Sequence, residues 1–245
     1  MAATYYVGTS GFSYNHWRGC FYPNDLPPHC WLEFYTSRFC TVELNNTFYR
    51  LPPEKTFKRW QVLPPEGFVY AVKVSRFITH QKKLRDSADA LRTFSSRAEI
   101  LGRKLGPLLY QLPPSMHRSD SNKEVLESFL KLLPREMSHA IEFRHESWLQ
   151  DDIYGLLRKY NVGFCIFDMP ELTAPAVSTS DFAYVRFHGS TGMYGSCYSD
   201  DELRQWAERI SGLAEGLKAV YIYFNNDFEG HAVRNAFTLR GYLSL

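Results

Sequence analysis

The chain has 245 residues, of which 44% are hydrophobic and 22% charged, and this ordinary globular composition excludes the disordered and fibrous classes. A formal net charge of +2 gives little reason to favour a nucleic-acid protein. No apolar run reaches the roughly 18 residues that span a bilayer, and no signal-peptide pattern follows the first Met, so we expect a cytoplasmic protein without a membrane partner.

Eight short runs rich in Val, Ile, Phe and Tyr predict β-strands. Most of them are apolar on both faces, which is typical of parallel strands that are covered on each side. In chain order the runs are 5–10, 39–45, 68–74, 106–112, 139–144, 163–168, 182–188 and 219–225.

Helical patterns occupy most of the intervening segments. Leu91, Phe94 and Ala98 recur three or four residues apart and form one apolar stripe. Ser199 and Glu202 have the spacing of a capping box at a helix start. The predicted helices lie within residues 27–39, 86–105, 122–133, 151–160, 199–217 and 230–239.

This alternation of strands and helices predicts an α/β fold, a single (β/α)8 barrel of the TIM type that extends over residues 1–245. A doubly wound open sheet is the alternative, but "GTSGFS" after the first strand is not its glycine-rich nucleotide turn. Residues 169–181 hold two prolines and little helical periodicity, which predicts an irregular crossover between strands six and seven.

Polar residues gather near the carboxyl ends of the predicted strands, where barrels of this type place their chemistry. They are Ser10, Glu43, Asn45, Lys73, Gln111, Glu142, Arg144, Asp168, Arg186, His188 and Asn225. Successive side chains of a strand alternate between its faces. By that rule Glu43 shares a face with Asn45, Glu142 with Arg144, and Arg186 with His188. If these faces point inward, three carboxylates, one lysine, two arginines and a histidine converge at one end of the barrel.

Glu43 lies in an otherwise apolar run, and a buried carboxylate needs a partner. Lys73, Arg144 or Arg186 can supply it. The network is either a structural filling of the barrel or a functional site. We favour a site, because replacing buried ion pairs with apolar residues is often neutral or stabilising.

The candidate catalytic groups are Glu43, Lys73, Glu142 and His188. The two glutamates can divide acid and base duties, and Lys73 is either a Schiff-base lysine or one half of a salt bridge. Arg144 and Arg186 suit a carboxylate or phosphate ligand, so Arg186→Met should leave thermal stability nearly unchanged.

Divalent metal binding is a weaker alternative. Glu43, Glu142, Asp168 and His188 are acceptable ligands, but the interleaved Lys and Arg residues would repel a cation. The five cysteines show no zinc-type spacing. We therefore expect no metal, no organic cofactor and no structural disulfide.

Aromatic residues follow several predicted strands and provide surfaces on which a sugar or base can stack. They are Phe12, Tyr14, Trp17, Phe48, Tyr49, Trp148, Tyr194 and Tyr198. Packing within loops is the alternative interpretation.

Seven stretches carry a family resemblance along nearly the whole chain. They are "YVGTSGFSYNHWRGCFYP", "VELNNTFYRLP", "AVKVSRFITH", "LLYQLPPS", "AIEFRHESW", "YVRFHG" and "YIYFNNDFEGHAVRNA". In this order they resemble the YecE-like family, also called domain of unknown function seventy-two. The resemblance implies a TIM-type barrel and no established activity.

The family's motif positions fall on residues of this chain that largely repeat the strand-end set. They are Ser10, Tyr14, Trp17, Glu43, Asn45, Thr47, Phe48, Lys73, His80, Gln111, Glu142, Arg144, Trp148, Arg186, His188, Asn225, Asn226, Asp227 and Asn235. The resemblance also implies substrate-binding candidates outside the strand-end set. They are Tyr14, Trp17, Trp148, Asn226 and Asp227.

Three functions remain open from the sequence. The first is an enzyme that uses acid and base residues on a small anionic or sugar-like substrate. The second is a nucleic-acid-binding protein or a phosphodiesterase of the endonuclease type. The third is a noncatalytic ligand-binding barrel. The mixed charges at the strand ends favour the first.

Overall fold

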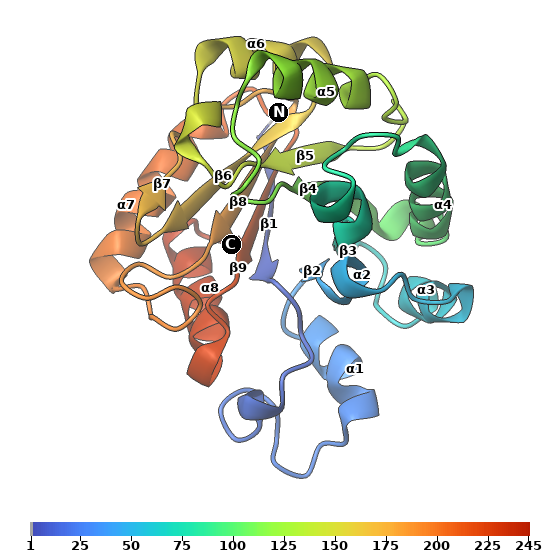
Figure 1. Cartoon of the computed structure of the whole chain (residues 1–245). Helices are drawn as coiled ribbons and strands as arrows, with labels where there is room; N and C mark the ends of the chain where they lie inside the picture. The colour runs from blue at the N-terminus through green and yellow to red at the C-terminus, as the bar shows by residue number, and fades with distance from the viewer. Residues whose placement is uncertain (1) are drawn as a thin grey trace.

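A computed structural model describes residues 2–245 and shows a nearly closed barrel of eight parallel strands (Figure 1). The strands pair in the order β1-β9-β8-β6-β5-β4-β3-β2. Their bounds are β1 (Thr4–Thr9), β2 (Thr41–Leu44), β3 (Val69–Lys73), β4 (Leu105–Gln111), β5 (His139–Glu142), β6 (Gly163–Met169), β8 (Phe182–Phe187) and β9 (Ala219–Phe224). The predicted α/β barrel and all eight predicted strands are confirmed.

Helices lie around the outside of the barrel (Figure 1). The α-helices are α1 (Trp31–Thr36), α2 (Asn46–Tyr49), α3 (Glu54–Val62), α4 (Ala88–Glu99), α5 (Asp120–Leu130), α6 (Asp151–Lys159), α7 (Asp200–Leu213) and α8 (His231–Tyr242). The shorter segments are η1 (Asn15–Trp17), η2 (Pro28–Cys30), η3 (Phe77–Gln81), η4 (Gly102–Lys104), η5 (Glu146–Trp148) and η6 (Phe228–Gly230). The capping box predicted at Ser199 and Glu202 begins α7. None of the helices in residues 2–245 combines the length and apolarity needed to cross a bilayer.

The crossover between β6 and β8 is irregular, as predicted. The described chain forms no helix there, and the two-residue strand β7 (Leu172–Thr173) folds back antiparallel to the end of β6. Asp168 of β6 is thereby paired with Thr173 of β7.

The side chains inside the barrel change from mainly apolar to polar along the barrel axis. Away from the strand ends it is filled by buried residues of inward-facing positions, namely Ala71, Leu109, Ala140, Cys165, Phe182, Tyr184, Ala219 and Tyr223. Two residues further along the same faces the side chains become polar, as in the step from Ala71 to Lys73 or from Ala140 to Glu142. The apolar layers therefore support a charged layer at the carboxyl-terminal end.

Strands β1 and β2 close the barrel without a regular ladder. An isolated bridge joins Ser10 to Glu43, and the N–H of Gly11 donates to the carbonyl of Glu43 at 2.8 Å. The hydroxyl of Tyr35 occupies the neighbouring gap and accepts a hydrogen bond from the N–H of Thr9 at 3.0 Å. The same bridge that completes the barrel thus brings Ser10 and Glu43 together.

The two strands approach closely because Gly8 has no side chain. The Tyr35 hydroxyl donates to the carbonyl of Thr41 at 3.1 Å. A Cβ on Gly8 would lie 2.4 Å from that carbonyl oxygen, which is too close for any side chain. A glycine in β1 is therefore a packing requirement of the closure.

We expect Gly8→Ala to destabilise the fold by about 1–3 kcal/mol, the usual penalty for overpacking, because backbone must move to relieve the contact. Gly155→Ala in α6 is the matched control. An added Cβ there meets nothing within 4 Å, and alanine should raise helix stability by up to about 1 kcal/mol. Urea unfolding of both variants measures the difference, and equal stabilities would contradict the proposed closure.

Candidate active site at the carboxyl ends of the strands

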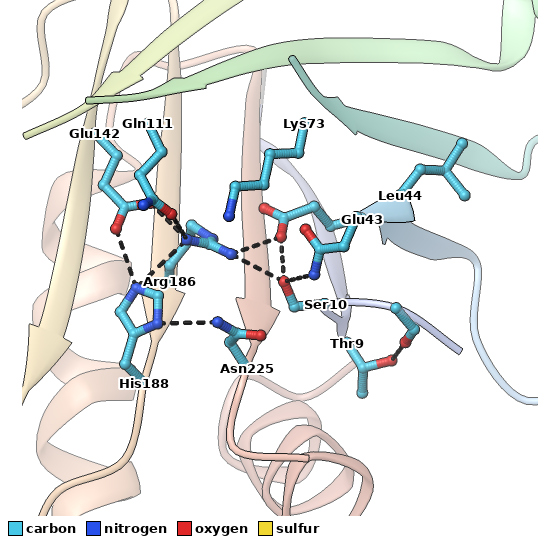
Figure 2. A network of polar contacts seen from close by, with 12 residues as sticks. Thr9, Ser10, Glu43, Leu44, Lys73, Gln111, Glu142, Arg186, His188 and Asn225 are labelled. Carbon is cyan, nitrogen blue, oxygen red and sulfur yellow. Dashed lines mark hydrogen bonds and ion pairs between the residues drawn. The ribbon is translucent and has the colours of Figure 1, made fainter. Parts of the chain in front are cut away.

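Side chains from both halves of the barrel converge at its carboxyl-terminal end (Figure 2). The predicted convergence of Glu43, Lys73, Glu142 and Arg186 is observed, and each of these side chains is buried. Gln111 from β4 points into the same network, as do His188 and Asn225, which follow β8 and β9.

Arg186 joins two carboxylates at the centre of the network. Its Nη2 lies 2.8 Å from Oε1 of Glu43, and its Nη1 lies 2.5 Å from Oε2 of Glu142. All three side chains are 0% exposed. Such burial is tolerated only with close pairing and further hydrogen bonds. Of the three cations that the sequence offers to Glu43, Arg186 is the partner.

The remaining acceptor capacity of Glu43 is also used. The Ser10 hydroxyl donates to Oε1, and the Tyr184 hydroxyl donates to Oε2 at 2.6 Å. Ser10 in turn accepts hydrogen bonds from Asn45 at 2.9 Å and from Arg186 at 3.0 Å. Tyr184 is absent from the sequence-based set, although it precedes Arg186 by two residues in β8 and so shares its inward face.

Glu142 is held as an anion between two arginines. Its Oε1 lies 2.5 Å from Nε of Arg144, and Arg186 contacts its other oxygen. Burial alone would raise the pKa of Glu142, but the guanidinium groups of Arg144 and Arg186 hold it well below its usual range. Glu142 therefore stays ionised near neutral pH, which suits the positioning of the arginines better than the acid or base duty predicted from the sequence.

His188 is a neutral imidazole in this setting. Its Nε2 lies 3.1 Å from Oε1 of Glu142 and 3.0 Å from Nη2 of Arg144, and Asn225 contacts Nδ1 at 3.1 Å. Burial, followed by the charges of Arg144 and Arg186, lowers the pKa of His188 to about 3. At neutral pH the ring is therefore uncharged and a weak base, so its role is to hydrogen-bond its neighbours.

Lys73 is the basic group of the network without a carboxylate partner. In residues 2–245 the ion pairs of this cluster join carboxylates to Arg144, Arg186 and His188, and none includes Lys73. The Nζ atom instead lies 4.4 Å from the centre of the Phe48 ring. The residue is 9% exposed, and burial together with the charge of Arg186 lowers the pKa of Lys73 to about 7.

Two clefts open above the network. The first, which we call the Lys73 cleft, has a volume of about 510 Å³ and is lined by Gly11, Phe12, Ser13, Tyr14, Leu44, Asn45, Asn46, Tyr49, Lys73, Tyr194, Asn225 and Asp227. The second, the Arg144 cleft, has about 490 Å³ and is lined by Gln111, Pro114, Arg144, His145, Glu146, Met169, Glu171, Leu172, Met193 and Tyr194. Tyr194 borders both clefts, and each volume is in the range of small-molecule sites.

Eight of the twelve predicted substrate-binding residues lie in these clefts or in the network below them. Those that line the Lys73 cleft are Tyr14, Asn45, Asn225 and Asp227, and those that line the Arg144 cleft are Gln111 and Arg144. Ser10 and Arg186 are buried in the network and line neither cleft.

The expectation that Asp168 joins the site is wrong. Cys165 belongs to the barrel interior, so Asp168, three residues later, points to the opposite face of β6. Its carboxylate accepts a hydrogen bond from the Thr173 hydroxyl of β7 at 2.7 Å. Two carboxylates rather than three therefore converge at the strand ends.

Both predicted tryptophans are packing residues rather than stacking surfaces. Trp17 and Trp148 are each 0% exposed. The indole of Trp17 donates to the carbonyl of Asp227 at 2.8 Å, and that of Trp148 donates to the carbonyl of Met116 at 2.6 Å. Neither ring has a free face for a ligand.

Asn226 likewise serves the loop that follows β8. Its side-chain amide donates to the carbonyl of Ser196 at 2.8 Å and to Oδ1 of Asn235 at 2.9 Å. It is fully buried and lies outside both clefts. Successive side chains point to opposite faces, so Asn226 points away from the barrel interior because Asn225 before it points inward after β9.

These contacts reverse the expectation that Arg186 can be removed without loss of stability. We expect Arg186→Met to cost about 3–5 kcal/mol, because Glu43 and Glu142 would be left buried and unpaired. Arg92→Met, which removes an exposed ion pair with Asp89, is the control and should cost less than about 1 kcal/mol. Denaturant unfolding measures both, and a stable Arg186→Met protein would disprove the central role of this pairing.

Lys73→Met should have the opposite effect near pH 7, where it removes an unpaired buried amine and so stabilises the fold. Unfolded lysine keeps its proton up to about pH 10.4. Folded Lys73 releases it near pH 7, so wild-type stability rises with pH between these values. The advantage of the variant should therefore shrink between pH 7 and about pH 10. A difference that does not change with pH would contradict the low pKa of Lys73, and Lys58→Met, at an exposed lysine, is the control variant.

Comparison with known proteins agrees with this architecture. The family model described as "Protein of unknown function DUF72" matches residues 6–245. The UPF0759 protein YunF of Bacillus subtilis (strain 168) is 26% identical over 265 residues, which cover 94% of this chain and 91% of that protein.

Two solved structures share the fold. The crystal structure of a DUF72 family protein from Thermotoga maritima has a TM-score of 0.90 and 33% identity, and the match covers 99% of this chain and 100% of that one. A DUF72 family protein from Enterococcus faecalis has a TM-score of 0.86 at 21% identity, covering 99% and 96% of the two chains. The strand-end motifs, the barrel and these matches together show that the chain belongs to the DUF72 family.

Proposed function

We propose that the protein is an enzyme that acts on a small anionic, sugar-like substrate in the Lys73 cleft, with Lys73 as the group that exchanges protons with it. One observation carries this proposal. Lys73 is a buried amine that faces a cleft and has no carboxylate partner within the described chain. An unpaired buried cation opposes folding, so its presence is better explained by chemistry than by stability.

The charge balance of the network supports an anionic substrate. Within the buried network three basic side chains, Lys73, Arg144 and Arg186, face two carboxylates, Glu43 and Glu142, while the carboxyl group of Asp227 lines the Lys73 cleft and lies 3.2 Å from His16. Arg186 directs its Nη donors at protein groups, whereas among residues 2–245 Nη1 of Arg144 donates only to the thioether of Met169, at 3.5 Å. A carboxylate or phosphate oxygen would be a better acceptor for that donor.

The lining of the Lys73 cleft supports a hydroxylated ligand. The Oδ1 atom of Asn45 is buried and has no hydrogen-bond partner within residues 2–245, so it can accept a donor from a bound molecule. Tyr14, Tyr49 and Tyr194 supply aromatic surface beside it. Polar groups set among aromatic rings are the usual composition of a site for a small polar ligand.

The proposed proton exchange depends on the pKa of the Lys73 amine. A base whose pKa is near the working pH exchanges protons most effectively, and Lys73 meets this condition at about 7. Once protonated it can stabilise negative charge that develops on the substrate in a water-poor site. These steps use only side chains of this chain and require no organic cofactor.

A nucleic-acid function is the second candidate, and the structure offers it less support. Backbone phosphates are bound mainly by exposed Lys and Arg side chains, but the basic groups of this site are buried. No group of three or more metal-ligating side chains occurs within residues 2–245, so the described chain offers no ready metal centre for a nuclease. A noncatalytic ligand-binding barrel is distinguished from an enzyme by turnover alone.

A ligand panel tests the proposal. Sugar phosphates, small hydroxy acids, neutral sugars and short oligonucleotides are compared by their effect on the thermal midpoint of the wild type and two variants. We expect an anionic, hydroxylated member to raise the wild-type midpoint, because ligand binding stabilises the folded state. The effect should be lost in Lys73→Met and retained in Lys58→Met, where the removed lysine is exposed. Stabilisation by oligonucleotides alone would favour the nucleic-acid function instead.

A further inference from the structure

We propose that Lys73 forms a covalent imine with its substrate, which is therefore a small hydroxylated aldehyde or ketone that carries an anionic group. This inference rests on the proposed function and adds the substrate class and the covalent step to it. The reasons are the position of the amine, the groups around it and the shape of the two clefts.

The position of Lys73 meets the requirements of an amine nucleophile. A nucleophilic lysine must be accessible to the ligand and free of a carboxylate that would hold it as ammonium. Lys73 lines the cleft, and its Nζ contacts the face of the Phe48 ring rather than an anion. Burial and then the charge of Arg186 lower the pKa of Lys73, and this effect exceeds the opposing effect of Glu142 and Glu43.

The condensation is balanced without any co-reactant. The lone pair of Nζ attacks the carbonyl carbon, the π bond breaks toward oxygen, and the nitrogen's first proton passes to that oxygen to give a carbinolamine. The nitrogen's second proton then passes to the hydroxyl group, the C–O bond breaks with release of water, and the nitrogen lone pair forms the C=N bond of the imine. Nothing is oxidised or reduced, so the step needs no redox cofactor.

Asp227 is placed to assist the loss of water. It lines the same cleft as Lys73, and its carboxyl group lies 3.2 Å from Nε2 of His16. Burial raises the pKa of Asp227 above its usual value, while the neighbouring His16 opposes this shift. We assign Asp227 the relay of a proton from the attacking nitrogen to the departing hydroxyl, which requires no proton stored on the carboxyl group beforehand.

The rest of the substrate is defined by two further groups. The unpaired Oδ1 of Asn45 accepts a hydrogen bond from a substrate hydroxyl group that lies near the substrate carbonyl. Arg144 lines the adjoining cleft, and its Nη1 atom, which contacts the thioether of Met169, can donate to an anionic group there. Tyr194 borders both clefts, so one ligand can reach from one cleft to the other. A molecule of a few carbons with a carbonyl, a hydroxyl and a carboxylate or phosphate has all three features.

Reductive trapping tests the inference on the full-length wild type. The protein is incubated at pH 7 with glyceraldehyde 3-phosphate, which has all three features, reduced with sodium borohydride, and analysed by intact mass and peptide mapping. We expect one adduct per chain, located on Lys73, whose yield saturates with probe concentration and falls when a non-carbonyl analogue such as glycerol 3-phosphate competes. Adducts that grow linearly with the probe and spread over exposed lysines such as Lys58 would overturn it.

Lys73→Arg provides the matched variant, because it keeps a basic side chain but cannot form an imine. It should lose the saturable adduct, whereas Lys58→Arg should keep it. If Lys73→Arg does not fold, the wild-type peptide map decides the question without it. If the anionic ligands raise the thermal midpoint and Lys73 remains unmodified, the imine is wrong and the proposed function stands. If neither binding nor adduct is found, both are wrong.

Discussion

The guanidinium group of Arg186, buried between the carboxylates of Glu43 and Glu142, is the interaction on which the rest of the site depends. It connects β8 to β2 and β5 across the barrel and allows two anions to lie in the buried interior. Glu43 also forms the bridge to Ser10 that closes the sheet, so the electrostatic network and the barrel closure share a residue. Both carboxylates are paired with arginines, and within residues 2–245 Lys73 forms no ion pair with either of them.

The same network separates the protonation behaviour of its members. Glu142 stays ionised between two guanidinium groups, and His188 stays neutral because burial and the arginines oppose its protonation. The pKa of Lys73 falls to about 7, so its charge changes near neutral pH while those of Glu142 and His188 do not. Divergent pKa values within one site are a common way for enzymes to assign acid and base duties. Lys73 is therefore the member of this group whose charge changes near neutral pH, while the charge states of Glu142 and His188 stay constant.

Much of this arrangement is predictable from strand periodicity. The two-residue repeat correctly places Glu142 with Arg144 and Arg186 with His188 on inward faces. The prediction fails at Asp168, because a position at a strand end does not by itself show on which face the side chain lies, and Asp168 lies on the face opposite to buried Cys165. Proximity to a strand end also cannot distinguish a ligand-facing tryptophan from one whose indole satisfies a loop carbonyl. Which arginine pairs with which glutamate depends on distances across the barrel, and a single sequence does not contain them.

Titration of the Lys73 side chain by NMR, following the ¹³Cε or ¹⁵Nζ resonance and assigned with Lys73→Arg, tests most directly whether this amine is the reactive group. A midpoint close to pH 7 is expected if Lys73 is buried beside two arginines and unpaired by a carboxylate. A midpoint at about 10.4, the value of an ordinary lysine, would show that it is an ion-paired or solvated cation. The assignment of chemistry to Lys73 would then be contradicted.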